Sequence, residues 1–250
     1  MNIIFKSVLM VLHLLLALVI CVTMIILPKN INHLLIQYWA KRLLRILKIK
    51  ITLTGEVLKF LGKDSYLVVS NHISWLDIPV IFSLKPITFV SASDVKTWPI
   101  IGMLAKISGA IFIDRNHKSN LPEVIQAMNF HFKNKKQSVC IFPEGTSTDG
   151  ESVRPFKPNL FESAVVANVP VYSLAIRYLS KSTGKRSNVP AFIGDMGLLE
   201  SMAQILKNRN LIVELTFFPP PGSAPEMPSD RKWLALHSHE QISRYLVDKS

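Results

Sequence analysis

The sequence predicts an α/β fold in which a mostly parallel sheet is flanked by helices, with a hydrophobic and amphipathic helical membrane module at the N-terminus. From residue 51 onwards, short apolar runs alternate with stretches of helical length, which is typical of a parallel sheet covered on both faces. Before residue 51, a long apolar segment precedes a basic one. We therefore expect a membrane-anchoring module at residues 1–50 and one larger domain at residues 51–250.

The first expected element is an apolar helix at residues 7–27, about as long as the hydrocarbon core of a bilayer requires. A cleavable signal peptide is the alternative, but the apolar run is too long and no small-x-small cleavage pattern follows it. Lys6 alone is basic before the helix, whereas several basic residues follow: Lys29, Lys41, Arg42, Arg45, Lys48 and Lys50. This asymmetry predicts that the rest of the chain lies on the cytoplasmic face of the inner membrane.

The second expected element, residues 31–49, is an amphipathic helix. Its apolar positions near helical spacing are Leu34, Leu35, Tyr38, Trp39, Leu43, Ile46 and Leu47, with basic residues between them. Such a helix can lie in the headgroup plane with its cations towards anionic lipid. A helix packed on its own domain fits the same pattern, but the neighbouring anchor favours the membrane interface.

The larger domain is expected to alternate strands and helices. The apolar runs of strand length are Tyr66–Val69, Ile87–Val90, Ala110–Ile113, Val139–Phe142, Val171–Ile176 and Leu211–Phe217. The helical stretches are Ile78–Leu84, Pro99–Ile107, Leu121–Lys133, Leu160–Ala167, Leu198–Leu206 and Arg231–Val247. Pro122 and Ser229 are suitable start signals for two of these helices.

The composition limits the class of protein. The 250 residues suffice for one sizeable domain plus an appendage. A formal net charge of +12 favours anionic partners such as nucleic acid, anionic lipid or an acidic carrier protein. The two cysteines, Cys21 and Cys140, indicate no disulfide framework and fit a reducing compartment. No metal-ligand spacing occurs; the nearest approach, residues 237–240, fits a solvated helix face better.

The first polar cluster follows the strand expected at Tyr66–Val69, where Asn71 and His72 stand in a turn with Asp77 five positions on. Turns at the carboxyl ends of strands are where α/β domains place their sites. A neutral imidazole can take a proton near pH 7, and a carboxylate on its other nitrogen fixes the tautomer. The alternative is that Asp77 caps a helix and His72 is an ordinary loop histidine.

Two further clusters end two other expected strands. Glu144 and Gly145 follow the strand at Val139–Phe142, and Gly145 allows close backbone approach to a ligand. The run Gly109–Arg115 ends in a cation that can hold a phosphate. Parallel strands deliver these clusters to one edge of the sheet, so we expect a single site there.

In order and spacing these blocks resemble the glycerolipid acyltransferase family of lysophosphatidic acid acyltransferases. The blocks are Asn71-His72-Ile73-Ser74-Trp75-Leu76-Asp77, Gly109 to Arg115, Phe142-Pro143-Glu144-Gly145-Thr146, and Val169-Pro170-Val171. The resemblance covers about residues 35–218. It implies a glycerol-3-phosphate acyltransferase-like fold and an acyltransferase domain at residues 51–250.

The resemblance also implies roles for these residues. His72 would be the general base that deprotonates a lysolipid hydroxyl, supported by Asp77. Arg115 would contact an acceptor phosphate. The other residues implied in substrate binding are Asn71, Glu144, Gly145 and Thr146. The acyl donor would be acyl-CoA or an acyl carrier protein, with no cofactor and no metal. The expected lipid acceptor is 1-acyl-sn-glycerol 3-phosphate, which would give phosphatidic acid.

The sequence departs from the family pattern at two phosphate-binding positions. Ser147 stands where the family usually has arginine, and Ala92 where it often has lysine. Arg154 and Lys157 are candidate replacements. The run from Glu144 to Lys157 is similar to the subgroup that includes lyso-ornithine lipid acyltransferases, whose acceptor carries no phosphate. Lyso-ornithine lipid is therefore the alternative acceptor.

Two other classes of protein fit less well. A non-catalytic, membrane-tethered binder of anionic lipid or nucleic acid would use the net charge of +12, but the basic residues are spread along the chain. No nucleic acid partner is therefore expected. A serine hydrolase would need a Gly-x-Ser-x-Gly elbow, which does not occur.

Overall fold

The structure, a computed structural model, describes residues 3–27, 29–62, 64–114, 120–208, 210–221 and 230–249. Its strands are β1 (Lys50–Gly55), β2 (Leu67–Ser70), β3 (Thr88–Ala92), β4 (Ile111–Ile113), β5 (Val139–Ile141), β6 (Val171–Ser180) and β7 (Leu211–Phe217). Its α-helices are α1 (Ile3–Ile26), α2 (Lys29–Leu47), α3 (Val57–Leu61), α4 (Asp77–Leu84), α5 (Ile101–Ile107), α6 (Leu121–Lys133), α7 (Glu162–Ala167), α8 (Leu198–Lys207) and α9 (Arg231–Asp248). Short 3₁₀ helices lie at Ser93–Thr97 and Pro158–Phe161.

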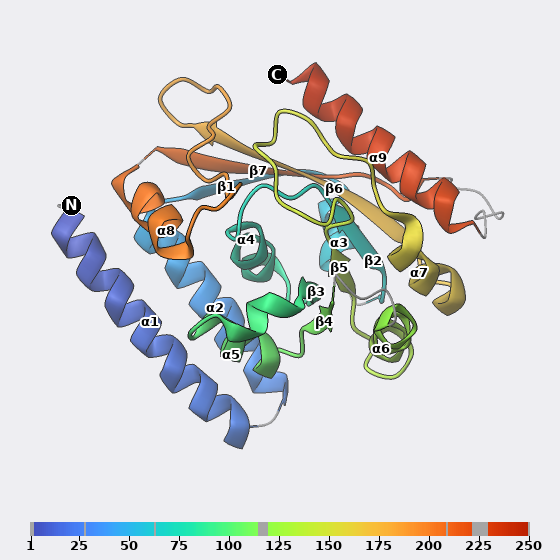
Figure 1. The fold of residues 1–250 in the computed structure, drawn as a ribbon, viewed down its shortest axis with the longest axis horizontal. Coiled ribbons are helices and arrows are strands. Elements are labelled where there is room, and N and C mark those ends of the chain that lie inside the picture. The colour runs from blue at the N-terminus through green and yellow to red at the C-terminus, as the bar shows by residue number, and fades with distance from the viewer. Residues whose placement is uncertain are drawn as a thin grey trace.

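The strands form one sheet in the order β1-β7-β6-β2-β5-β3-β4 (Figure 1). Neighbouring strands are parallel throughout, except that β6 and β7 pair antiparallel. The predicted mostly parallel sheet is therefore confirmed. Because β2 and β5 are parallel neighbours, with Val69 opposite Ile141, the loops that leave them begin at the same edge of the sheet.

Strand β1, at residues 50–55, pairs in parallel with β7 and was not among the predicted strands. This strand lies at the end of the sheet and alternates polar with apolar residues, and all of its residues are at least partly exposed. It lacks the continuous apolar run that marked the buried strands. Its period-2 alternation of Lys50, Ile51, Thr52 and Leu53 is the signal that identifies such an edge strand.

Helices cover both faces of the sheet in two hydrophobic clusters. One cluster joins α1, α2, α4 and α8 to one face, and the other joins α6, α7 and α9 to the opposite face (Figure 1). Successive residues of β2 alternate between them, since Val68 belongs to the first cluster and Val69 to the second. This double coverage explains why the central strands are apolar without interruption.

The N-terminal helix α1 packs along the body of the molecule against α2, α5 and α8. Lys6 is buried and its Nζ donates to the carbonyl of Leu206 at 3.1 Å. Trp39 of α2 donates from its Nε1 to the carbonyl of His13 at 3.4 Å. Both helices share one hydrophobic cluster with the sheet, so packing continues across the predicted boundary at residue 50.

Leu34 and Tyr38 of α2 are exposed, but most of the exposed apolar surface of the two N-terminal helices belongs to α1. Its exposed side chains include Ile4, Phe5, Val8, Val11, Leu12, Leu15, Val19, Val22, Ile25 and Ile26. The segment Ile4–Ile26 is long and apolar enough to cross a membrane. Of its most apolar stretch of 18 residues, 33% is buried within the protein. Helix α2 packs against α1 and α4, and its apolar residues Trp39, Leu43, Ile46 and Leu47 are buried. This packing fits the alternative of a helix packed on its own domain, and the position of α2 in the headgroup plane stays a prediction.

Candidate active site

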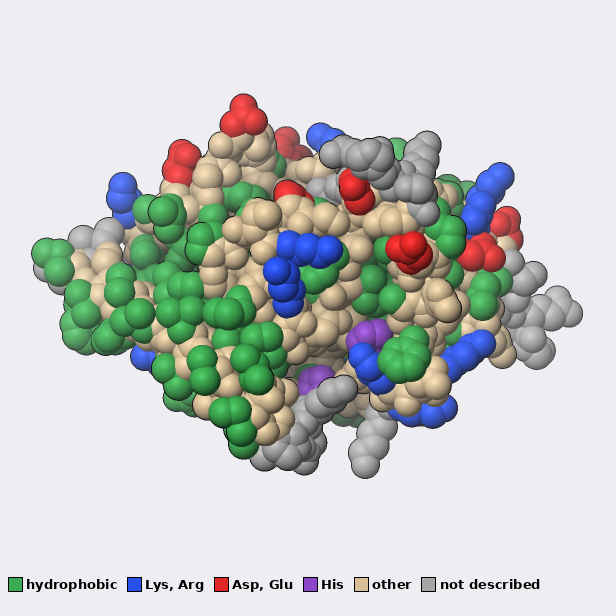
Figure 2. All heavy atoms as spheres, turned by 60° about the horizontal axis from the view of Figure 1, so that its bottom comes forward, with side chains coloured by type: hydrophobic (Ala, Val, Ile, Leu, Met, Phe, Trp, Pro, Cys, Tyr) green, Lys and Arg blue, Asp and Glu red, His purple; other side chains and the backbone are tan. Residues whose placement is uncertain are grey.

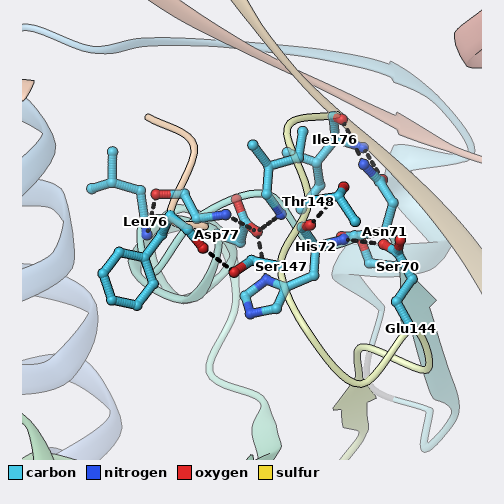
Figure 3. A network of polar contacts seen from close by, with 12 residues as sticks. Ser70, Asn71, His72, Leu76, Asp77, Glu144, Ser147, Thr148 and Ile176 are labelled. Atoms are coloured by element: carbon cyan, nitrogen blue, oxygen red, sulfur yellow. Dashed lines mark hydrogen bonds and ion pairs between the residues drawn. The ribbon is translucent and has the colours of Figure 1, made fainter. Parts of the chain in front are cut away.

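The turn between β2 and α4 holds the predicted pair of His72 and Asp77. His72 lies in the turn, and Asp77 is the first residue of α4. The Nδ1 atom of His72 lies 2.8 Å from Oδ2 of Asp77 (Figure 3). The same oxygen accepts hydrogen bonds from the backbone N–H groups of Ile73 at 2.8 Å and Ser74 at 2.9 Å. Asp77 thus folds back onto the turn that carries His72, so its contacts are not those of a helix cap.

The contacts of Asp77 define the state of the imidazole. An ionised carboxylate only accepts hydrogen bonds, so Nδ1 of His72 carries the proton. The Nε2 atom then has a free lone pair, which is the form that a general base requires. The ring of Phe142 stacks on that of His72 with centroids 4.1 Å apart, which restricts rotation of the imidazole.

Tyr178 of β6 holds the other oxygen of the Asp77 carboxylate. Its hydroxyl donates to Oδ1 of Asp77 at 2.7 Å, and both side chains are buried. Burial, reinforced by the charge of Asp77, raises the pKa of Tyr178 well above its usual value, so the hydroxyl stays protonated and donates. Tyr178 was not among the predicted site residues. The available signal was a polar aromatic side chain at a buried position of a strand, which needs a hydrogen-bond partner.

Glu144, in the loop after β5, fixes the backbone of His72. Its Oε1 accepts from the N–H of His72 at 2.7 Å, and its Oε2 accepts from the N–H of Arg154 at 2.8 Å. The N–H of Thr148 donates to the carbonyl of His72 at 2.8 Å. The loop after β5 therefore holds both polar backbone groups of His72. Burial raises the pKa of Glu144, while its two backbone donors oppose that shift.

Asn71 is buried and bonds the neighbouring strand. Its Nδ2 donates to the carbonyl of Ile176 at 3.0 Å, and its Oδ1 accepts from the N–H of Ile176 at 2.8 Å. These two bonds extend the pairing of β2 with β6 past the end of β2 at Ser70. These contacts support a positioning role for Asn71 beside His72, and the substrate contact that the resemblance implied stays a prediction.

A cavity of about 280 Å³ opens beside His72. Its lining is mostly apolar and comes from α2, α4, α5 and the loop before α8, and includes Trp39, Phe82, Ile101, Leu104 and Phe192. Because Asp77 occupies Nδ1 of His72, Nε2 is the ring nitrogen available to a molecule bound there. An apolar cavity with one basic nitrogen at its wall suits a long hydrocarbon chain with a reactive polar end.

The remaining predicted residues lie around Gly145 or outside the described chain. Gly145 has φ +78°, and a Cβ there would approach Nζ of Lys157 to 2.6 Å. The Lys157 ammonium thus lies over this glycine, next to Thr146, which lines the cavity. The Arg154 side chain is exposed. Arg115 lies outside the described residues.

Ser147, which replaces the usual arginine of the family, also lines the cavity. Its hydroxyl donates to the carbonyl of Phe192. This bond joins the loop after β5 to the loop before α8, and both loops contribute to the cavity wall. Where the family usually has an arginine, this protein therefore has a serine that links two loops.

The arrangement defines a class of enzyme site. A histidine and an aspartate at a strand end, with an apolar cavity beside the imidazole, have the groups that a general-base site for a substrate with a long apolar chain requires. A sequence profile of the family described as Acyltransferase matches residues 48–177. The chain belongs to this family.

Curated relatives fall into two groups. The chain is 34% identical over 213 residues to a lyso-ornithine lipid O-acyltransferase of Pseudomonas aeruginosa, a match that covers 83% of this chain and 76% of the relative. It is 33% identical over 154 residues to a 1-acyl-sn-glycerol-3-phosphate acyltransferase of Neisseria gonorrhoeae, which covers 62% of this chain and 59% of the relative.

The fold is shared with a solved structure. The crystal structure of the 1-acyl-sn-glycerophosphate acyltransferase PlsC from Thermotoga maritima aligns with a TM-score of 0.62 over 97% of both chains, at 17% identity. At that identity the likeness concerns the fold. It includes the two N-terminal helices, since nearly the whole of each chain is aligned.

Proposed function

We propose that this acyltransferase moves a fatty acyl group from a thioester to the free hydroxyl of a lysolipid. His72 Nε2 takes the hydroxyl proton while the oxygen attacks the thioester carbonyl. The C–S bond then breaks, and the thiolate leaves with that proton, giving an ester and a thiol. The observation that carries this proposal is the hydrogen bond between His72 and Asp77 at the wall of an apolar cavity. Asp77 stabilises the imidazolium that forms during the attack.

The donor is an acyl thioester, either acyl-CoA or an acyl carrier protein, whose acyl chain occupies the cavity. A thioester is already activated, so the protein needs no covalent intermediate. Every group required by this step comes from the chain and the two substrates. The proposed cofactor requirement is therefore none.

Lysophosphatidate is one candidate acceptor. The observation that favours it is the ammonium of Lys157 over Gly145, beside the cavity residue Thr146. A lysine in this place can bind a phosphate as a point charge. Lys157 then supplies the positive charge that is missing at position 147, where the family usually has arginine.

Lyso-ornithine lipid is the second candidate acceptor. Among the described residues that line the cavity, none is lysine or arginine. The curated relatives with this activity also match a larger part of the chain, 83% for the relative from P. aeruginosa and 85% for one from Rhizobium meliloti. A cavity wall without these cations suits an acceptor that carries no phosphate.

One assay tests the reaction and chooses the acceptor. Purified protein receives an acyl-CoA in detergent micelles, with either lysophosphatidate or lyso-ornithine lipid, and thiol release and acylated lipid are both measured. The proposal expects release of one thiol for each ester formed with one of the two acceptors. Absence of turnover with both acceptors, and with acyl carrier protein as donor, would refute the reaction.

We further propose that the protein acts at the cytoplasmic face of the inner membrane, with α1 lying in one leaflet. The packing of α1 along α2, α5 and α8 supports this orientation, because a helix crossing the bilayer would have to leave those partners. A helix that crosses the bilayer would also lose the buried hydrogen bond from Lys6 to the carbonyl of Leu206. The exposed apolar face of α1 would then contact the acyl chains.

A further inference from the structure

A network of basic side chains joins the end of α6 to the start of α2. Nζ of Lys135 lies 3.2 Å from Nε2 of His131, and Nδ1 of His131 lies 3.1 Å from Oε1 of Gln137. Nε2 of Gln137 lies 3.0 Å from Nε2 of His33 on α2. Gln137 Oε1 only accepts, so His131 carries its proton on Nδ1 and accepts from Lys135 on Nε2. This chain of bonds fixes the end of α6 to the N-terminal helices.

Three lysines give this region its charge. Lys133, Lys135 and Lys136 are all exposed, and we call them, together with His131, the basic cluster. Burial and the charge of Lys135 lower the pKa of His131 to about 4, so that histidine is neutral at pH 7. Within the described chain, neither Lys133 nor Lys136 forms an ion pair with a carboxylate. Phe130 stands beside the lysines with 50% of its surface exposed.

The basic cluster adjoins the exposed apolar face of α1. Asn32, at the start of α2, donates to the carbonyl of Met24 near the end of α1, and the next residue, His33, bonds Gln137. Figure 2 shows histidine and lysine or arginine side chains beside the apolar surface, while the acidic side chains visible there lie in its upper half. The apolar face and the cations thus lie on the same side of the molecule.

The cluster is remote from the chemistry. His131 bonds Thr88 at the first residue of β3, and Gln137 precedes β5, so both lie at the amino ends of these strands. His72 and Glu144 follow the carboxyl ends of β2 and β5, at the opposite edge of the sheet. A ligand at the basic cluster would therefore not react at His72.

We propose that the basic cluster and Phe130 bind the headgroups of anionic phospholipids and, with the apolar face of α1, form a two-part membrane-binding surface. This inference rests on the membrane association proposed above. Lysines at an anionic surface attract phosphate groups, and an aromatic ring beside them suits the headgroup level. The hydrogen bonds that link His131 to His33 through Gln137 fix the position of the lysines relative to the N-terminal helices.

Vesicle binding tests the proposal. The full chain is sedimented with vesicles of phosphatidylcholine alone, or of an equal mixture of phosphatidylcholine and phosphatidylglycerol. A variant carrying Lys133→Gln, Lys135→Gln and Lys136→Gln is compared with wild type and with a control carrying Lys181→Gln, Lys185→Gln and Lys232→Gln. The control lowers the net charge equally, at exposed lysines of the turn after β6 and of α9.

We expect the cluster variant to bind the mixed vesicles on the order of 100-fold more weakly than wild type, since three lysines near the surface are lost. Binding to phosphatidylcholine alone, through α1, stays unchanged, and the control binds as wild type does. Equal losses in the two variants, or no preference of wild type for the mixed vesicles, would overturn the proposal.

The detergent-micelle assay separates this inference from the proposed reaction. The cluster variant is expected to keep wild-type turnover in micelles, where no bilayer surface is needed. Wild type that turns over in micelles but binds neither kind of vesicle would overturn the membrane surface and leave the reaction standing. A Phe130→Ser variant is expected to weaken binding to both kinds of vesicle by a few-fold.

Discussion

Tyr178 and His72 hold opposite oxygens of one carboxylate, that of Asp77. Tyr178 donates to Oδ1 at 2.7 Å, and His72 lies 2.8 Å from Oδ2. Because β6 lies beside β2 in the sheet, the strand that carries Tyr178 is fixed relative to the turn that carries His72. The orientation of the His72 imidazole is thus set by the sheet and not by the turn alone.

Tyr178→Phe removes one donor from Asp77 and leaves the fold intact. Oδ1 of Asp77 loses the donor that holds it, so the carboxylate and the imidazole bonded to it are less well oriented. We expect kcat to fall on the order of tenfold with little change in KM. Tyr172→Phe is the control, because the Tyr172 hydroxyl makes no hydrogen bond within the described chain and its ring packs on Tyr66. An unchanged kcat, or a rise in KM at constant kcat, would contradict the positioning role of Tyr178.

His72→Ala and Asp77→Ala are expected to differ in stability. Without the base, His72→Ala loses a hundredfold or more in kcat, while its melting temperature stays near that of wild type. Asp77→Ala loses activity too, but it also leaves the buried Tyr178 hydroxyl and two backbone N–H groups without their acceptor. That costs on the order of 3 kcal/mol of folding free energy. Thermal unfolding of both variants, measured beside turnover, checks the difference; equal melting temperatures would contradict it.

Much of this site followed from the sequence, because strand ends in a parallel sheet meet at one edge. The apolar runs before His72 and Glu144 were enough to place both residues there. Tyr178 could not be placed, since its contact spans 101 positions and depends on β6 being the neighbour of β2. For the same reason the sequence did not reveal that Asn71 bonds Ile176, nor that β7 runs antiparallel beside β6.

Glu144→Gln distinguishes a positioning role from substrate binding. Both carboxylate oxygens of Glu144 accept hydrogen bonds from backbone N–H groups. In glutamine an NH₂ group replaces one of these oxygens, so it faces the N–H of His72 or of Arg154 and that hydrogen bond is lost. We expect kcat to fall on the order of tenfold or more, with the KM for the acceptor unchanged. Glu151→Gln, at an exposed carboxylate paired with Arg186, is the control. A rise in KM at constant kcat would show instead that Glu144 binds the acceptor.

Lys157→Met tests the acceptor. If Lys157 binds a phosphate, the KM for lysophosphatidate rises on the order of tenfold, while any turnover of lyso-ornithine lipid is unchanged. Methionine is one atom shorter than lysine but keeps an unbranched side chain over Gly145, so the loop after β5 keeps most of its packing. Lys185→Met is the matched control at an exposed lysine in the turn after β6. An unchanged KM for lysophosphatidate would show that Lys157 does not bind the phosphate.

His131→Gln tests how the buried network responds to acid. Burial and Lys135 lower the pKa of His131 to about 4 in the folded protein, against 6.5 in the unfolded chain. The unfolded chain therefore binds more protons between these values, and the stability that the neutral ring provides is lost as the pH falls from 6.5 to about 4. That loss is on the order of 3 kcal/mol at most. Urea unfolding at several pH values is expected to show a shallower acid decline in His131→Gln than in wild type or in His237→Gln, a control on α9. The same slope in all three proteins would mean that His131 already takes up its proton in the folded state.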